Sequence, residues 1–62
     1  MKLIKLTEFR YARKIYLNVN HLVAFWWEDG RTVFVTSNDD GFGDAKETPE
    51  EIIELIKQAE EI

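Results

Sequence analysis

The sequence predicts an α+β fold, a four- to five-stranded antiparallel β-meander followed by one C-terminal α-helix packed on one sheet face. Apolar and polar residues alternate from Ile15 to Val19, which is typical of a half-buried strand. The Asp29-Gly30 pair between two β-prone segments favours a two-residue hairpin turn. Apolar residues after Pro49 recur at helical spacing. The 62 residues contain no linker or repeat, so we expect one domain, 1–62.

The first third of the chain supplies two expected strands, at 2–7 and 14–19. In the first strand, Ile4 and Leu6 share a face and should point into the core. The connection at 8–13 contains neither Gly nor Pro, so its turn type cannot be read from the sequence. A brief break follows the second strand at 20–21, because Asn tolerates turn conformations.

The middle of the chain supplies further strands at 22–28 and 31–36, and a weaker pattern allows a short fifth strand at 42–46. Four β-branched residues favour extended backbone in the strand expected at 31–36, and they are Thr32, Val33, Val35 and Thr36. The segment from Ser37 to Gly43 is polar and rich in Gly, and we interpret it as a loop.

The clearest element is a helix expected at about 49–60. Thr48 is a favourable N-cap, and Pro49 at the first helical position loses no hydrogen bond. Glu51 lies three residues after Thr48, the position at which a capping box has a Glu or Gln side chain. An apolar face is formed by Ile52, Leu55, Ile56 and Ala59, with Ile53 widening it.

Six consecutive apolar residues, Leu22 to Trp27, carry the main inference about assembly. Strict alternation puts Leu22, Ala24 and Trp26 on one face and Val23, Phe25 and Trp27 on the other. One helix can cover only one face of the sheet, and such a small domain often needs oligomerisation to bury enough surface. We therefore predict a homo-oligomeric or partner interface that includes Tyr16, Val23, Phe25, Trp26, Trp27 and Phe34.

Positive charge gathers in the first twenty residues, although the net charge of the chain is −4. The segment after the first strand interleaves cations with an aromatic ring and offers a nucleic-acid contact at Arg10, Tyr11, Arg13 and Lys14. The alternative interpretation of the same pattern is a solvated connection with cation–π packing. The C-terminal segment is acidic, which is typical of a solvated helix face.

No pattern indicates catalysis, so we predict a non-enzymatic protein without catalytic, cofactor or metal residues. The chain has no Cys and a single His, His21, with Ser37 the only serine available to it. An EF-hand-like spacing of Thr36, Asn38, Asp40, Gly41 and Glu47 lacks the first Asp and a preceding helix. We interpret that segment as an acidic turn between strands.

Three segments carry a family resemblance, and they run from Ile4 to Thr7, from Asn18 to Leu22 and from Lys46 to Ile52. Their order and spacing resemble the small FlbD-type flagellar and swarming motility family of bacteria. The resemblance implies an association with motility, no catalytic residues and no cofactor. The chain departs from the family pattern at three places, which are Arg10 to Arg13, Phe25 to Trp27, and the longer acidic stretch from Ser37 to Asp44.

These observations predict a cytoplasmic, homo-oligomeric protein-interaction module whose partners are itself and an unidentified protein. A small nucleic-acid-binding or regulatory protein is one alternative, and an oligomer whose aromatics line small-ligand pockets is another. The first five residues are too short and too charged for a signal peptide, and no segment has the length of a membrane span, so we expect no membrane insertion.

Overall fold

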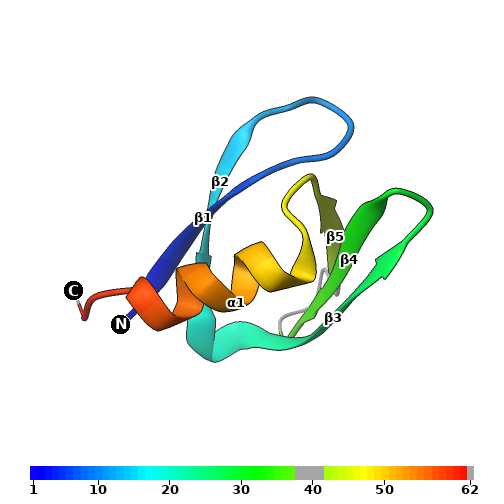
Figure 1. Ribbon diagram of the computed structural model, residues 1–62. Helices are drawn as coiled ribbons and strands as arrows, with labels where there is room; N and C mark the ends of the chain where they lie inside the picture. Colours follow the sequence, from blue (N-terminus) through cyan, green and yellow to red (C-terminus); the bar gives the residue numbers. More distant parts are fainter. Residues whose placement is uncertain (38–41, 62) are drawn as a thin grey trace.

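Five antiparallel strands and one C-terminal helix make up the α+β fold of the computed structural model, which describes residues 1–37 and 42–61 (Figure 1). The elements in chain order are β1 (Leu3–Thr7), β2 (Lys14–Asn18), the 3₁₀ turn η1 (Val19–His21), β3 (Leu22–Glu28), β4 (Arg31–Thr36), β5 (Phe42–Ala45) and α1 (Pro49–Gln58). The predicted fold class and the short fifth strand are confirmed, and the helix ends at Gln58 rather than near residue 60.

The strands form two sheets, β1-β2 and β3-β4-β5, where the sequence suggested one meander. η1 separates β2 from β3, and the side chain of Asn18 caps it by accepting from Asn20 N at 3.0 Å. The two sheets meet instead at the ends of β1 and β5. There Lys46 N donates to Thr7 O at 2.9 Å, and Phe9 N donates to Asp44 O at 3.2 Å. We call this meeting point the β1–β5 junction.

A small apolar core lies between the two sheets and α1, which packs on β1 and β3 (Figure 1). Its buried members come from four elements and are Ile4, Leu6, Phe34, Ala45 and Ile52. Phe34 lies over Gly43, where a Cβ atom would approach Phe34 Cζ to 2.9 Å. Gly43 therefore allows the ring to fill this part of the core.

A β-bulge at the start of β3 corrects the predicted alternation. Leu22 pairs with Thr36 and Ala24 pairs with Val35, so Val23 is an extra residue in the strand. The extra residue resets the alternation, and Leu22 and Phe25 both pack against the core, although simple alternation places them on opposite faces. Val23 is left exposed.

The Asp29-Gly30 turn has the backbone that the sequence predicted. Asp29 has φ 52° and Gly30 has φ 80°, and both values belong to the left-handed region. Two successive positive φ angles define the type I′ turn, whose twist matches that of the strands β3 and β4.

The predicted capping box is also formed at the start of α1. Glu51 N donates to Thr48 Oγ1 at 3.1 Å, and Thr48 N donates to Glu51 Oε1 at 2.8 Å. Thr48→Ala removes one of these bonds, so we expect it to lower the free energy of unfolding by about 1 kcal/mol. Urea unfolding followed by circular dichroism measures the change. An unchanged midpoint would contradict a stabilising cap.

The chain ends lie beside each other (Figure 1). Lys2 pairs with Glu61 in an isolated β-bridge, and the Met1 amino group forms an ion pair with the Glu61 carboxylate. No helix within residues 1–37 or 42–61 has the length and apolar character needed to cross a bilayer.

Candidate functional site

The first candidate surface lies along the open edge of β3, and we call it the β3 edge surface and define it by Val23, Trp26 and Trp27. These side chains are 64%, 42% and 51% exposed. Trp26 and Trp27 are neighbours in the regular part of the strand, so their side chains lie beside this edge on opposite faces of the sheet. β3 pairs with β4 along one side, and its other side pairs with no strand among the residues that the structure describes. The surface therefore combines aromatic side chains with an open strand edge.

The polar groups on this surface are few. Trp26 Nε1 donates to Glu28 Oε1 at 2.9 Å, so the indole N–H is satisfied and the ring remains half exposed. β3 contains neither Lys nor Pro, the residues that commonly protect an edge strand from pairing. The bulge at Val23 is the one protective feature, and it leaves the strand from Ala24 onward regular.

The other predicted interface residues divide between surface and core. Tyr16 is exposed but lies on β2, in the other sheet, with Lys5 Nζ 5.8 Å from its ring centroid. Phe25 is partly buried against the core. Phe34 is only 6% exposed, so its placement at an interface was wrong. It pairs with Phe25 and faces inward, because β4 buries alternate residues and Phe34 shares the buried face with Thr32.

The second candidate surface is the tip of the β1–β2 hairpin, residues 8–13. Glu8 N donates to Arg13 O at 2.8 Å, and Ala12 N donates to Glu8 O at 3.0 Å. Ala12 has φ 58°, a left-handed conformation that favours Gly and costs an alanine about 1 kcal/mol. No residue type in the sequence indicates this turn, because the residue with the positive φ angle is Ala12 and not Gly.

The tip brings together three of the four residues predicted to contact nucleic acid. Arg10 Cζ and Arg13 Cζ lie 6.0 and 5.5 Å from the centroid of the Tyr11 ring. Lys14 does not join them, because its Nζ donates to Thr7 Oγ1 at 2.7 Å. The cation–π packing that formed the alternative interpretation is therefore present in the fold.

Arg13 is held by a carboxylate as well as by the ring. Its Nε donates to Glu8 Oε1 at 2.6 Å and its Nη2 donates to Glu8 Oε2 at 3.3 Å. The hydrogen bond to Glu8, and then the charge of Glu8, raise the pKa of Arg13 above its ordinary value. Both groups are positioned by closure of the hairpin.

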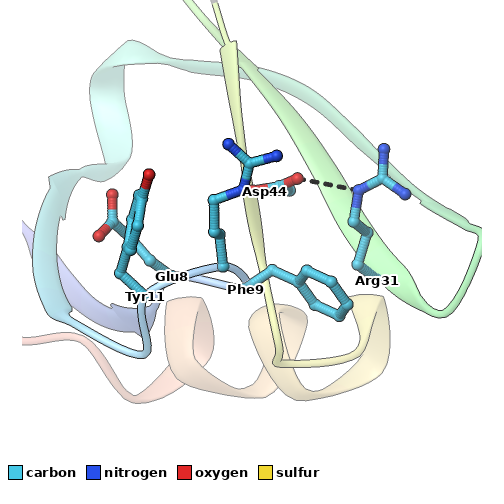
Figure 2. Close-up of a pocket in the computed structure, with 6 residues that line it drawn as sticks. Glu8, Phe9, Tyr11, Arg31 and Asp44 are labelled. Carbon is cyan, nitrogen blue, oxygen red and sulfur yellow. Dashed lines mark hydrogen bonds and ion pairs between the residues drawn. The ribbon is translucent and has the colours of Figure 1, made fainter.

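Beside the tip lies an open hollow of about 670 Å³, which we call the loop hollow (Figure 2). Its lining comes from the tip and from two strands of the other sheet: Glu8, Phe9, Arg10, Tyr11, Arg31 and Asp44. Arg31 Nε donates to Asp44 Oδ2 at 2.8 Å, and Arg31 Cζ lies 6.0 Å from the Phe9 ring centroid. Sequence reasoning missed Phe9, Arg31 and Asp44, because only the β1–β5 junction brings them together.

A Ser–His pair occurs at the other end of β3. His21 Nδ1 and Ser37 Oγ are 2.9 Å apart, and Ser37 N donates to His21 O at 2.8 Å. The side chain of His21 thus bonds the hydroxyl of the one serine in the sequence. Among the described residues no carboxylate bonds this ring, so the pair lacks the orienting group of a catalytic triad. The hydrogen bonds between His21 and Ser37 link the residue before β3 to the residue after β4.

The EF-hand-like spacing is only partly visible. Asn38, Asp40 and Gly41 lie outside the described residues, and Glu47 bonds Thr7 through both carboxylate oxygens. Within residues 1–37 and 42–61, no three His, Cys, Asp or Glu side chains are grouped so that they could hold a metal ion.

Two surfaces therefore remain as candidate sites, the β3 edge surface and the loop hollow. Both are exposed, and they share no residue. Comparison with protein-family models, with curated proteins and with solved structures finds no match for this chain.

Proposed function

We propose that this protein is a non-enzymatic interaction module that binds a second copy of itself through the β3 edge surface. The observation that supports the proposal is a pair of half-exposed tryptophans on an edge strand without Lys or Pro. An unprotected edge strand with apolar side chains is a ready template for pairing with another chain.

The apolar contribution can be weighed against the cost of association. A Trp side chain buries on the order of 150–250 Å², so covering two half-exposed ones removes roughly 200 Å² per protomer from water. Two protomers would gain about 10 kcal/mol from this burial. Association costs ~4–15 kcal/mol, so the tryptophans alone do not ensure a dimer. The backbone groups of the open edge must contribute as well.

Antiparallel pairing of two β3 strands satisfies this requirement. With the symmetry axis at Phe25, Trp26 of one copy stands opposite Ala24 of the other, so a large side chain meets a small one. The only charged residue of β3 is Glu28, at the end of the strand. In this arrangement the two Glu28 carboxylates lie at opposite ends of the contact and do not repel each other strongly.

The test is the mass in solution. We expect sedimentation equilibrium of the wild-type protein between 5 and 500 μM (about a hundredfold range around typical weak-dimer affinities) to give a mass above the 7.3 kDa of one chain. Trp26→Lys and Trp27→Lys should return it to 7.3 kDa, because a lysine at the contact leaves a buried charge. Circular dichroism checks that both variants remain folded.

Ile53→Lys is the matched control. Ile53 is also half exposed and apolar, but it belongs to α1 and not to the open edge strand. We expect this variant to keep the wild-type mass. A wild-type protein of 7.3 kDa throughout the concentration range, or equal effects of all three lysines, would contradict the proposal.

The resemblance to the FlbD-type motility family belongs to the same proposal, because the resemblance implies a protein that acts without catalytic residues. We place its action in the cytoplasm, since a chain without Cys suits a reducing compartment. Deletion of the gene in a motile host, followed by a swarming assay, tests the motility association.

A further inference from the structure

We propose that the loop hollow binds a nucleotide, with the base against the aromatic rings of the hairpin tip and the phosphate on Arg10. This inference goes beyond self-association and uses none of the residues of the β3 edge surface. Its ligand could be a free mononucleotide or one nucleotide of a single strand, since both present the same base and phosphate.

The rings of Phe9 and Tyr11 are the first part of the site. They are 41% and 65% exposed, so each offers a surface on which a base can stack. Each ring also has a guanidinium near it, that of Arg31 for Phe9 and that of Arg13 for Tyr11. The hydrogen-bonded turn around Ala12 holds the tip in one conformation, which reduces the entropy lost on binding.

The charge balance of the hollow favours one anionic group. Arg13 is paired with Glu8 and Arg31 with Asp44. Within the part of the chain that the structure describes, Arg10 has no ion pair, and its recorded contact is the Tyr11 ring. Its guanidinium is therefore available, and its planar fork of donors suits the oxygens of a phosphate.

The Arg31–Asp44 pair is the third part of the site. It presents a donor group beside an acceptor group at the wall of the hollow, with both side chains partly exposed (Figure 2). Base edges also carry donors and acceptors side by side, and arginine and carboxylate groups read them in other proteins. Guanine presents a carbonyl acceptor beside two donor groups, N1–H and the amino group, on one edge, whereas cytosine presents one donor group there, so guanine matches this pair better than a pyrimidine does.

The size of the hollow is compatible with such a ligand. Small-molecule sites commonly measure about 300–1,000 Å³, and the loop hollow measures about 670 Å³. A phosphotyrosine side chain would also supply a ring and a phosphate. It has no donor for the Asp44 carboxylate, so the hollow favours the nucleotide.

The test is a titration of the ¹⁵N-labelled protein, followed by backbone and arginine side-chain chemical shifts. We expect GMP to move the signals of residues 8–13, Arg31 and Asp44 and to reach saturation. Arg10→Gln should weaken GMP binding about tenfold or more, because a charge-assisted phosphate contact is lost. Tyr11→Ala should weaken it about fivefold or more through loss of stacking.

Lys57→Gln is the matched control, since it removes one exposed positive charge from α1, outside the lining of the hollow. We expect it to leave GMP affinity unchanged within about twofold. Trp26→Lys should also bind GMP normally, so failure of self-association and failure of nucleotide binding are separate results.

Three further probes identify the source of the ligand or overturn the proposal. An eight-nucleotide single-stranded RNA that binds more than about tenfold tighter than GMP, and more weakly at higher salt, assigns the site to a strand. Equal affinity assigns it to a free nucleotide. Inorganic phosphate or phosphotyrosine that binds as tightly as GMP, or signals that do not move with GMP, would overturn nucleotide binding.

Discussion

Leu6→Ala should cause a large loss of stability, about 2–5 kcal/mol in the free energy of unfolding. Leu6 is fully buried at the centre of the core, between the two sheets and α1. Truncating a buried leucine to alanine costs ~2–5 kcal/mol, since it removes apolar contacts and leaves a cavity. A domain of 62 residues has a free energy of unfolding of about 3–9 kcal/mol in total. At the middle of both ranges, the substitution removes about half of the stability.

Urea unfolding followed by tryptophan fluorescence measures this loss, at one protein concentration for all variants because self-association would shift the midpoint. Ile53→Ala is the control, since it removes the side chain of a half-exposed residue from a helix. We expect its free energy of unfolding to change by less than about 0.5 kcal/mol. A Leu6→Ala loss below about 1 kcal/mol would contradict the position of Leu6 in the core.

Glu47→Ala should have the second largest effect, a loss of ~2–3 kcal/mol. The Glu47 carboxylate accepts from Thr7 N at 2.9 and 3.1 Å and from Thr7 Oγ1 at 2.9 Å. Nearby, the buried Thr32 donates to the Glu47 carbonyl at 2.5 Å. Removing the carboxylate leaves the buried Thr7 N–H without an acceptor in the described structure, and the missing bond is charge-assisted.

A graded series separates the hydrogen bonds from the charge. Glu47→Gln keeps one acceptor oxygen, so its stability should lie between those of the wild type and Glu47→Ala. Glu60→Ala removes a carboxylate from an exposed position near the C-terminus and should leave the urea midpoint unchanged. Equal midpoints for Glu47→Ala and Glu60→Ala would show that the contacts to Thr7 do not stabilise the fold.

The parts of the fold that sequence reasoning predicted correctly are those whose cause is local. The helix begins where Thr48 and Glu51 can cap it, and β3 turns into β4 where Gly30 accepts a positive φ angle. In both cases a residue type and the structure that it favours lie within four positions of each other. Periodicity placed the strands for the same reason.

The parts that were missed depend on contacts between residues distant in the sequence, or on a residue type that is unusual for its backbone conformation. The bulge at Val23 puts Leu22 on the same side as Phe25, where strict alternation had separated them, and no residue type in the sequence indicates the bulge. Ala12 occupies a position typical of Gly. The loop hollow needs Asp44 beside the hairpin tip, a contact that the β1–β5 junction creates. Of the candidate sites, the tryptophans and the basic tip were foreseeable, but their separation into two surfaces was not.

The β1–β5 junction also affects the order in which the parts of the chain fold. The hairpins β1–β2 and β3–β4 are closed by neighbouring residues, so each can form on the microsecond timescale typical of isolated hairpins. Thr7 and Glu47 are 40 residues apart. The chain must therefore lose the conformational entropy of a long segment before the hydrogen bonds between these two residues can form. The contact between Thr7 and Glu47 therefore carries a larger cost in loop-closure entropy than either hairpin turn does.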